Sequence, residues 1–346
     1  MRLPHCPRIA IALNLLLVLA TLAGREGCGC TPTNPDAPPP PYNLGLVPTA
    51  LDIAWPTEPM VDREVVVQNP EELINGYFES NTTLRVNVDL NELTIDADDV
   101  VIAPAQGVRI QTLRILRGRE RLRFEGGSYG KVIFEPPHIL VTDDGGFMAD
   151  GMIEDVLFDS VVVDDGSPAM AVRGRRVAVL HSYLSSNSMA FFVGDTTPIP
   201  STDIIVADSV LESAGSGSTL VLNQVERSVV VDSWITNPVS FGYVVSGESD
   251  MTFARENVLL GGGASIGDWP GSDVGRGWFL ANRIYHTAQL FGFDPDQIEE
   301  LHLAANTIYS DRVTCAWCSP ATPERWNVAS NTVRPYEMPP AVPERP

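Results

Sequence analysis

Short apolar runs recur between residues 157 and 333, and each run ends at a polar residue that is followed two places later by an aliphatic one. The residue three places before each polar position is also apolar. Successive polar positions lie about 24 residues apart, so the pattern is an internal repeat whose unit is too short to bury its own apolar side chains. The repeated polar residues are Ser160, Ser182, Ser209, Ser233, Asn257, Asn282, Asn306 and Asn331.

Two short strands joined by a sharp polar bend explain these registers, because side chains alternate between the two faces of a strand. Serine and asparagine bond to nearby backbone and tolerate bent conformations. Stacked about 4.8 Å apart in successive coils, they can also bond to one another. We therefore expect the eight residues to form one polar ladder. A third strand in each coil is predicted at residues 170–173, 191–194, 220–223 and 243–246.

Three strands in about 24 residues resemble the right-handed, pectate-lyase-like parallel β-helix. The resemblance covers residues 61–336 and implies an all-β rod of about ten or eleven coils. Asn69-Pro70-Glu71-Glu72-Leu73 has the N-cap, first-turn proline and acidic residues of a short helix. Families with this fold commonly begin with such a capping helix. A two-domain or sandwich fold would have to produce eight matching registers by chance.

The N-terminus has the pattern of an export signal. Arg2 and Arg8 precede an apolar run from Ile9 to Ala23, which is short for a membrane span. We predict a signal peptide over residues 1–24. Cys28, followed by a proline-rich stretch, resembles the tether of a bacterial lipoprotein, so residues 25–60 are predicted to be a linker or tether. Lipidation of Cys28 and ordinary cleavage near Ala23 both remain open. Residues 337–346 form a proline-rich tail.

Cysteine number bears on the redox compartment. Cleavage near Ala23 leaves four of the five cysteines, an even number that suits disulfides outside the cytoplasm. Cys315 and Cys318 are expected to close a local loop as a disulfide, because no βαβ pattern surrounds them. Two cysteines supply only half of the ligands of a structural zinc site, so no metal site is predicted.

The formal net charge of -21 restricts the partners. Nucleic acid and anionic lipid need a basic surface, so we expect no nucleic-acid partner and no membrane contact beyond a lipid anchor at the N-terminus. The predicted location is the cell envelope, as an outer-membrane lipoprotein, or the extracellular space. A polysaccharide or another envelope protein is the expected partner.

Many proteins with this fold lyse or hydrolyse acidic polysaccharides, but the chain lacks their Asn-Thr-Asp, Gly-His-Gly and Arg-Ile-Lys motifs. Two acidic doublets, Asp143-Asp144 and Asp164-Asp165, are candidate catalytic residues. Each doublet is followed by a glycine, so turn formation also explains them. Calcium is the cofactor that a lyase would use, and no motif supports it here, so we predict no cofactor.

Histidine and arginine supply the other candidates. His181 precedes a ladder residue, and the coils on either side carry Asp159 and Asp208 at that position. A neighbouring carboxylate can raise the pKa of the imidazole and make it a usable acid, whereas a surface imidazole in a polar turn has no such role. Arg173, at the end of a third strand, is a further catalytic candidate.

Four alternating arginines would point to one side of a strand. They could grip an acidic glycan, or pair with Asp96, Asp98 and Asp99 on an adjacent coil. Asn223 and Asp268 are further binding candidates near the edge of the third-strand face, whose outward residues are apolar. The four arginines are Arg117, Arg119, Arg121 and Arg123.

Two functions fit these observations. The first is a non-catalytic, exported β-helix that serves adhesion, glycan binding or envelope structure. The second is a polysaccharide lyase or glycoside hydrolase with a diverged active site. The two differ in one feature, because an enzyme needs two or three of the candidate side chains to meet in one cleft.

Overall fold

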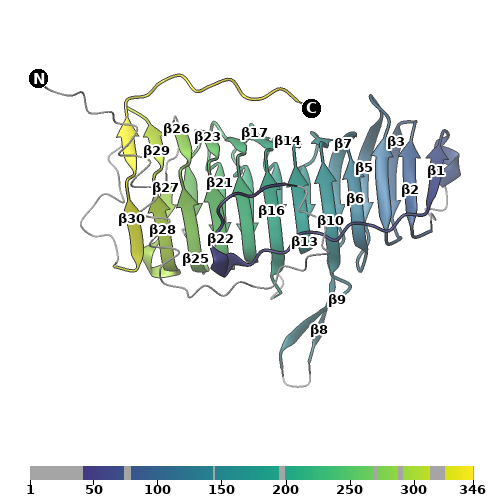
Figure 1. Cartoon of the computed structure of the whole chain (residues 1–346), viewed down its shortest axis with the longest axis horizontal. Coiled ribbons are helices and arrows are strands. Elements are labelled where there is room, and N and C mark those ends of the chain that lie inside the picture. Colours follow the sequence, from purple (N-terminus) through teal and green to yellow (C-terminus); the bar gives the residue numbers. More distant parts are fainter. Residues whose placement is uncertain are drawn as a thin grey trace, which may run out of the picture.

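The computed structural model describes residues 42–73, 79–142, 145–194, 199–267, 271–286, 291–311 and 324–345. Within these residues the chain is an all-β parallel solenoid of about nine complete coils, with incomplete coils at both ends (Figure 1). The strands of one face lie side by side along the whole rod (Figure 1).

Sheet 1 contains one strand from every coil, and all of its pairings are parallel. Its 12 strands, in order along the rod, are β1 (Arg63–Val67), β2 (Thr82–Val86), β4 (Val100–Pro104), β6 (Glu120–Glu125), β10 (Ile153–Asp159), β13 (Gly174–Leu180), β16 (Ser201–Ala207), β19 (Val225–Val231), β22 (Glu248–Arg255), β25 (Asp273–Leu280), β28 (Ile298–Ala304) and β30 (Trp326–Ala329).

Two further faces complete each coil. In the first coils, one longer strand takes the place of the strands of both faces. These longer strands are β3 (Leu90–Ile95), β5 (Arg109–Ile115) and β7 (Ser128–Phe134). The last of them, β7, pairs with the first strand of each of the two faces that follow. Sheet 2 then consists of β11 (Val162–Val163), β14 (Tyr183–Ser186), β17 (Val210–Ser213), β20 (Trp234–Thr236), β23 (Val258–Gly261), β26 (Arg283–His286), β29 (Thr307–Tyr309) and β31 (Thr332–Arg334). Sheet 3 consists of β12 (Met170–Val172), β15 (Phe191–Val193), β18 (Leu220–Asn223), β21 (Tyr243–Ser246), β24 (Ala264–Ile266) and β27 (Phe291–Phe293).

The polar ladder runs along the corner between sheets 1 and 2. The backbone N–H of Asn257 donates to Oδ1 of Asn282 at 3.0 Å, and that of Asn282 donates to Oδ1 of Asn306 at 2.9 Å. In the same way, the backbone N–H of Ser182 donates to Oγ of Ser209 at 3.1 Å. Six of the ladder side chains are almost completely buried, so each coil satisfies a buried amide of the coil before it. These six are Ser182, Ser209, Ser233, Asn257, Asn282 and Asn306.

Ser160 does not belong to this ladder, which corrects the sequence prediction. Leu180 pairs with Asp159 and Tyr183 with Val162, so Val161 occupies the ladder position of that coil. The N–H of Val161 donates to Oγ of Ser182 at 3.2 Å. Ser160 is exposed and has a φ of 59°, as do the residues that precede the ladder in other coils, such as His181 at 48°. The sequence register was therefore wrong by one place in this coil.

The interior of the rod is one continuous apolar cluster that extends from Val67 to Trp326. Its side chains stack from coil to coil, as Phe124 and Phe158 do with ring centroids 4.6 Å apart. The inward residues of the predicted third strands, such as Met170 and Phe191, belong to this cluster. The buried apolar area of all coils is therefore shared, and no coil has a core of its own.

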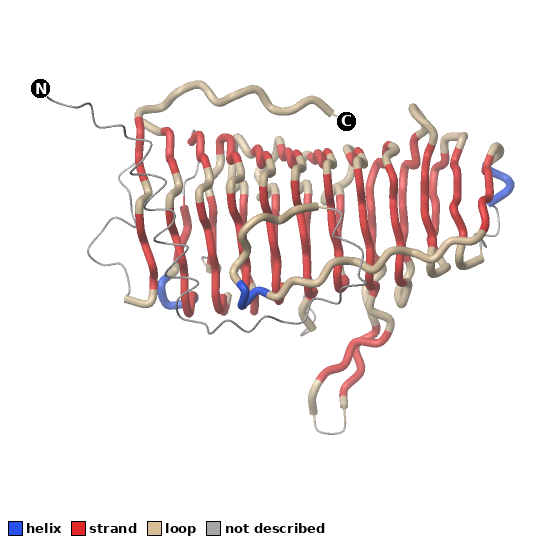
Figure 2. The backbone as a smooth tube through the Cα atoms, viewed as in Figure 1, coloured by secondary structure: helices blue, strands red, loops and turns tan. Residues whose placement is uncertain are grey.

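Two predictions about the ends of the rod are corrected. Among the described residues the helices are short 3-10 turns: η1 (Thr49–Leu51), η2 (Pro70–Leu73) and η3 (Pro295–Gln297) (Figure 2). Asn69 does cap η2, since its Oδ1 accepts from the N–H of Glu71 at 3.1 Å, but the described part of the first coil contains no α-helix. The coils that the described residues form number about nine instead of ten or eleven.

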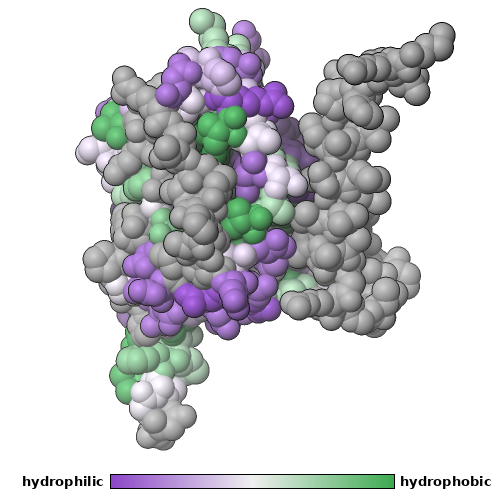
Figure 3. Space-filling model, turned by 90° about the vertical axis from the view of Figure 1, so that its left-hand side faces the viewer, coloured by the Kyte–Doolittle hydropathy of each residue, from purple (hydrophilic) through white to green (hydrophobic). Residues whose placement is uncertain are grey.

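A hairpin of β8 (His138–Val141) and β9 (Phe147–Asp150) projects from the rod. Its strands pair only with each other among the described residues. Val141 is 71% exposed and Phe147 56%, so the hairpin presents apolar side chains to solvent. Figure 3 shows it as the largely hydrophobic projection at the bottom of the molecule.

Both ends of the described chain lie back against the rod (Figures 1 and 2). Residues 42–60, which we expected to be part of a linker, form an extended segment on the outer face of sheet 1, and we call it the N-terminal strap. Residues 335–345 extend along the outside of the coils that carry sheet 2, and we call them the C-terminal tail. The predicted signal peptide, Cys28, Cys315 and Cys318 lie outside the described residues.

The ladder yields a stability prediction. Asn282→Ala leaves the buried N–H of Asn257 and the carbonyl of Ala254 without their partner. Since a buried polar group without a hydrogen bond costs about 1–3 kcal/mol, we expect the free energy of unfolding to fall by about 3 kcal/mol in urea titrations. Ser160→Ala is the matched control, and it should cost less than about 0.5 kcal/mol because Ser160 is exposed and outside the ladder. Equal losses in the two variants would contradict the assignment.

Candidate functional site

A column of alternating acids and arginines crosses six successive strands of sheet 1, from β4 to β19. Each member adopts a positive φ between 53° and 62°. This left-handed bend is uncommon for residues other than glycine, so its recurrence shows that successive coils repeat the same backbone geometry at this position. The members are Asp99, Arg121, Asp155, Arg176, Asp203 and Arg227, and we call them the acid–arginine column.

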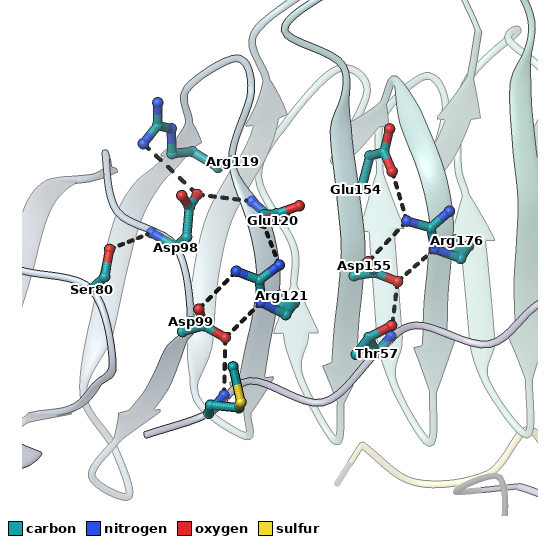
Figure 4. Close-up of polar contacts among 11 residues, drawn as sticks. Thr57, Ser80, Asp98, Asp99, Arg119, Glu120, Arg121, Glu154, Asp155 and Arg176 are labelled. Atoms are coloured by element: carbon teal, nitrogen blue, oxygen red, sulfur yellow. Dashed lines mark hydrogen bonds and ion pairs between the residues drawn. The ribbon is translucent and has the colours of Figure 1, made fainter. Parts of the chain in front are cut away.

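The column consists of three two-bond ion pairs. In the first, Nε and Nη2 of Arg121 donate to the two carboxylate oxygens of Asp99 at 2.7 and 2.8 Å. Asp155 with Arg176 and Asp203 with Arg227 repeat this geometry, with distances of 2.6 to 3.0 Å. Figure 4 shows the first two pairs on neighbouring parts of sheet 1. The planar guanidinium matches the carboxylate, which makes this a strong form of ion pair.

The aspartate carboxylates of these ion pairs are buried. The side chains of the three aspartates are only 5 to 7% exposed. The hydrogen bonds from Arg121 lower the pKa of Asp99 below its usual value, although burial acts in the opposite direction. Asp99 therefore holds its negative charge, and that charge is available to a further hydrogen-bond donor.

The further donor is the backbone of the N-terminal strap. The N–H of Thr57 donates to Oδ1 of Asp155 at 2.8 Å. The N–H groups of Ala54 and Met60 donate in the same way to Asp203 at 3.2 Å and to Asp99 at 3.0 Å. The three aspartates lie two coils apart, about 9.6 Å, and three residues of extended chain span about 9.3 Å. The strap therefore meets one aspartate at every third residue.

Apolar and charged contacts hold the rest of the strap. Leu51 is completely buried in an apolar cluster on the outer face of sheet 1, which includes Phe253 and Trp278. Arg255 donates to the carbonyls of Leu44 and Leu46 at 3.0 and 3.1 Å. The strap therefore covers an apolar face that would otherwise be open to solvent.

The four alternating arginines all pair with acids of this chain. Arg117 pairs with Glu135 at 2.7 Å. Arg119 lies 3.8 Å from Asp96 and 3.7 Å from Asp98, and Arg121 pairs with Asp99. Arg123 pairs with Glu58 of the strap at 2.8 Å and with Glu125 at 2.9 Å. The arginines are thus part of the structural pairing on and beside β6, and Figure 4 shows two of them.

Asp164 and Asp165 lie just after β11, and both have basic or amide partners. Asp164 pairs with Arg109 at 2.7 Å and with Arg345 of the tail at 3.4 Å. Asp165 accepts a hydrogen bond from the side chain of Gln111. Asp143, Asp144 and Asp268 lie outside the described residues.

His181 stands at the corner between sheets 1 and 2. Its Nδ1 is 2.8 Å from Oδ1 of Asp159, and its Nε2 is 3.9 Å from Oδ2 of Asp208. The ring of Tyr42, at the start of the described strap, packs edge-on with its centroid 5.8 Å away. The imidazole is therefore held between two acids and one end of the strap.

The remaining candidates belong to the end of sheet 3. Nε of Arg173 donates to the carbonyl of Gly194 at 3.2 Å, and Oδ1 of Asn223 accepts from Oγ of Ser246 at 3.2 Å. The candidate residues thus occupy separate places: sheet 1, its corner with sheet 2, the end of β11 and the end of sheet 3. In the part of the chain that the structure describes, no three His, Cys, Asp or Glu residues are grouped so that they could hold a metal ion.

The described residues include no helix that is long and apolar enough to cross a membrane.

No protein-family model and no curated protein matches the chain. Two solved structures are similar in fold. The Dettilon tailspike protein has a TM-score of 0.45 and 11% identity, over 73% of this chain and 62% of that chain. PfbA, a surface adhesin of Streptococcus pneumoniae, has a TM-score of 0.34 and 8% identity, over 73% of each chain. This chain therefore spans less than two thirds of the tailspike. The similarities concern the parallel β-solenoid and assign no family.

The strap contacts give a prediction for hydrogen exchange. Asp155→Ala removes the acceptor of the Thr57 amide, so we expect that amide to exchange at least about tenfold faster, as measured by mass spectrometry of the peptide that covers residues 53–60. Glu154→Ala is the matched control, because Glu154 also pairs with Arg176 but has no hydrogen bond to the strap among the described contacts. Equal acceleration in both variants would show that the column does not hold the strap.

The lowered pKa of Asp99 gives a prediction for pH. Its pKa is lower in the folded than in the unfolded protein, so its contribution to stability is present above about pH 3.9 and is lost as the pH falls through the folded value. We expect Asp99→Asn to be less stable than the wild type at pH 7, and this difference to shrink below about pH 4 in urea titrations. In the control Asp62→Asn, which alters an exposed acid, the difference should stay near zero; a constant gap for Asp99→Asn would contradict the assignment.

Proposed function

We propose that the protein is a non-catalytic β-helix of the cell envelope or the extracellular space, which serves adhesion, glycan binding or envelope structure. The observation that carries this proposal is that its charged candidates pair with other charged side chains of the chain, at separate places on the rod. A catalytic site needs acid, base and stabilising groups around one substrate bond. Here the acids instead bind arginines and hold the strap.

Export is the second part of the proposal and depends on the sequence before the strap. The basic start, the apolar run to Ala23 and the proline-rich stretch after Cys28 support a signal peptide followed by a tether. The mature protein then begins either near residue 24 or at a lipidated Cys28. The mass of its N-terminal peptide distinguishes these two forms. A polysaccharide or another envelope protein is the proposed partner, in keeping with the acidic net charge.

The alternative, a polysaccharide lyase or glycoside hydrolase, is favoured by one contact. His181 is hydrogen-bonded to Asp159 at 2.8 Å, and an imidazole oriented by a carboxylate is a common proton-transfer group. The side chain of His181 is 39% exposed, so solvent reaches it. Asp159 and Asp208 are the acids beside this imidazole, and the other catalytic candidates that the structure describes lie elsewhere on the rod.

A glycan screen decides between the two functions. We expect the full chain to cleave no acidic or neutral polysaccharide, with or without calcium, while a glycan array or pull-down detects binding to a polysaccharide or envelope component. Because His181 is paired with Asp159 and packs against Tyr42 of the strap, His181→Ala should leave such binding within about twofold. Cleavage products that disappear in His181→Ala would establish the enzyme instead. A failure to bind any glycan would leave envelope structure as the function and contradict glycan recognition.

A further inference from the structure

The C-terminal tail lies on the outer surface of the coils that carry sheet 2 (Figure 1). It leaves β31, and the N–H of Tyr336 donates to Asp311 at 2.9 Å. Val342 then packs on an apolar cluster of β20, β23, β26 and β29, and Arg345 reaches Tyr183 of β14. The tail thus crosses six coil spacings, about 29 Å, with 11 residues, and an extended polyproline II segment of that length spans about 34 Å.

Every third tail residue faces the rod. Pro339 and Val342 are half-buried in an otherwise exposed segment, and Arg345 makes the polar contacts. Polyproline II has three residues in each turn, so one edge of such a helix presents these three positions. The prolines at 335, 339, 340 and 343 favour that conformation before the tail binds, which reduces the entropy that docking costs.

The surface beneath the tail is aromatic. The rings of Tyr285 and Tyr309 stack with centroids 4.5 Å apart and are almost parallel. They form one buried cluster with Val258 and Leu260, and Trp234 packs beside them. An aromatic surface of this kind suits a proline-rich helix, whose ridges are apolar and whose backbone needs no sheet partner.

Contacts of Arg345 mark the far end of this surface. The guanidinium carbon of Arg345 lies 4.3 Å from the centroid of the Tyr183 ring. Nη2 of Arg345 donates to the hydroxyl of Tyr183 at 3.2 Å, and Nη1 lies 3.4 Å from Oδ2 of Asp164. The hydroxyl of Tyr183 in turn bonds to Glu212. An aromatic face and the carboxylate of Asp164 beside one guanidinium favour arginine at this position.

We propose that this surface is a binding site for proline-rich segments of a partner protein with the pattern Pro-x-x-Val-x-x-Arg, and that the tail occupies it in the free protein. Residues 339–345, Pro-Pro-Ala-Val-Pro-Glu-Arg, have this pattern themselves. The arginine of the partner replaces Arg345 between Tyr183 and Asp164, and its valine lies over the tyrosine pair. The site is distinct from the acid–arginine column and does not depend on glycan binding.

The covalent link gives the tail an advantage over a free segment. A tethered segment acts at an effective concentration of about a millimolar, so a partner must bind considerably tighter than that to displace it. Weakening the anchor of the tail therefore exposes the site. Arg345→Ala does so without changing the rod, because Arg345 belongs to the tail and its side chain is 55% exposed.

The test uses the full chain and a fluorescent peptide of residues 335–346. We expect saturable binding to Arg345→Ala in fluorescence anisotropy, and at least tenfold weaker binding to the wild type, whose tail occupies the site. A peptide with alanine in place of Arg345 should bind at least tenfold more weakly to the same variant. Adding Asp164→Asn should weaken the peptide similarly, whereas Glu71→Gln, an acid of η2 at the first coil, should have no effect.

A second measurement follows the tail itself. A fluorophore attached to the C-terminus should become more mobile in Arg345→Ala and in Asp164→Asn, but not in Glu71→Gln. Unchanged mobility, or equal binding of the peptides with and without arginine, would overturn the proposal. A dimer that dissociates when the peptide is added would also contradict it, since the tail of a second copy would then be the occupant.

Discussion

The spacing of about 4.8 Å between hydrogen-bonded coils is the constraint on which the rest of the structure depends. Parallel backbone pairing repeats each corner at this distance, so a polar side chain at one corner lies within reach of the same corner in the next coil. The ladder from Ser182 to Asn331 follows directly, because each side chain accepts from a backbone N–H of the coil before it. A buried bend would otherwise leave that amide without a partner, which costs about 1–3 kcal/mol.

The same spacing explains how a chain with a net charge of -21 keeps acids close together. In the acid–arginine column, arginine stands between each aspartate and the next, so like charges are two coils apart. An aspartate that accepts two bonds from arginine still has capacity for a third donor. The strap supplies it through backbone N–H groups, which makes the column a docking surface for main chain.

The sequence predicted what depends on repetition within a coil. The positions of the ladder, the inward aliphatic residues and the third strands follow from the period, and the register failed only where Ser160 precedes an apolar Val161. The acid–arginine column could also have been predicted from the period, because its members stand six places before the ladder position of their coil. This holds for Asp155, Arg176, Asp203 and Arg227. The contacts of the strap could not be predicted in this way, since they join residues 39 to 211 places apart and follow no period, and its prolines suggested a linker.

The two extended segments use the spacing of the coils in different ways. The strap bonds through the amides of residues 54, 57 and 60, and its prolines at 48, 56 and 59 lie where no amide is needed. Its docking therefore combines main-chain hydrogen bonds at every third residue with an apolar contact that is centred on Leu51. The tail makes its contacts through the side chains of Val342 and Arg345. Recognition by side chains is transferable to any segment that presents the same groups at the same period, so the face of sheet 2 is the one where another chain can replace the protein's own.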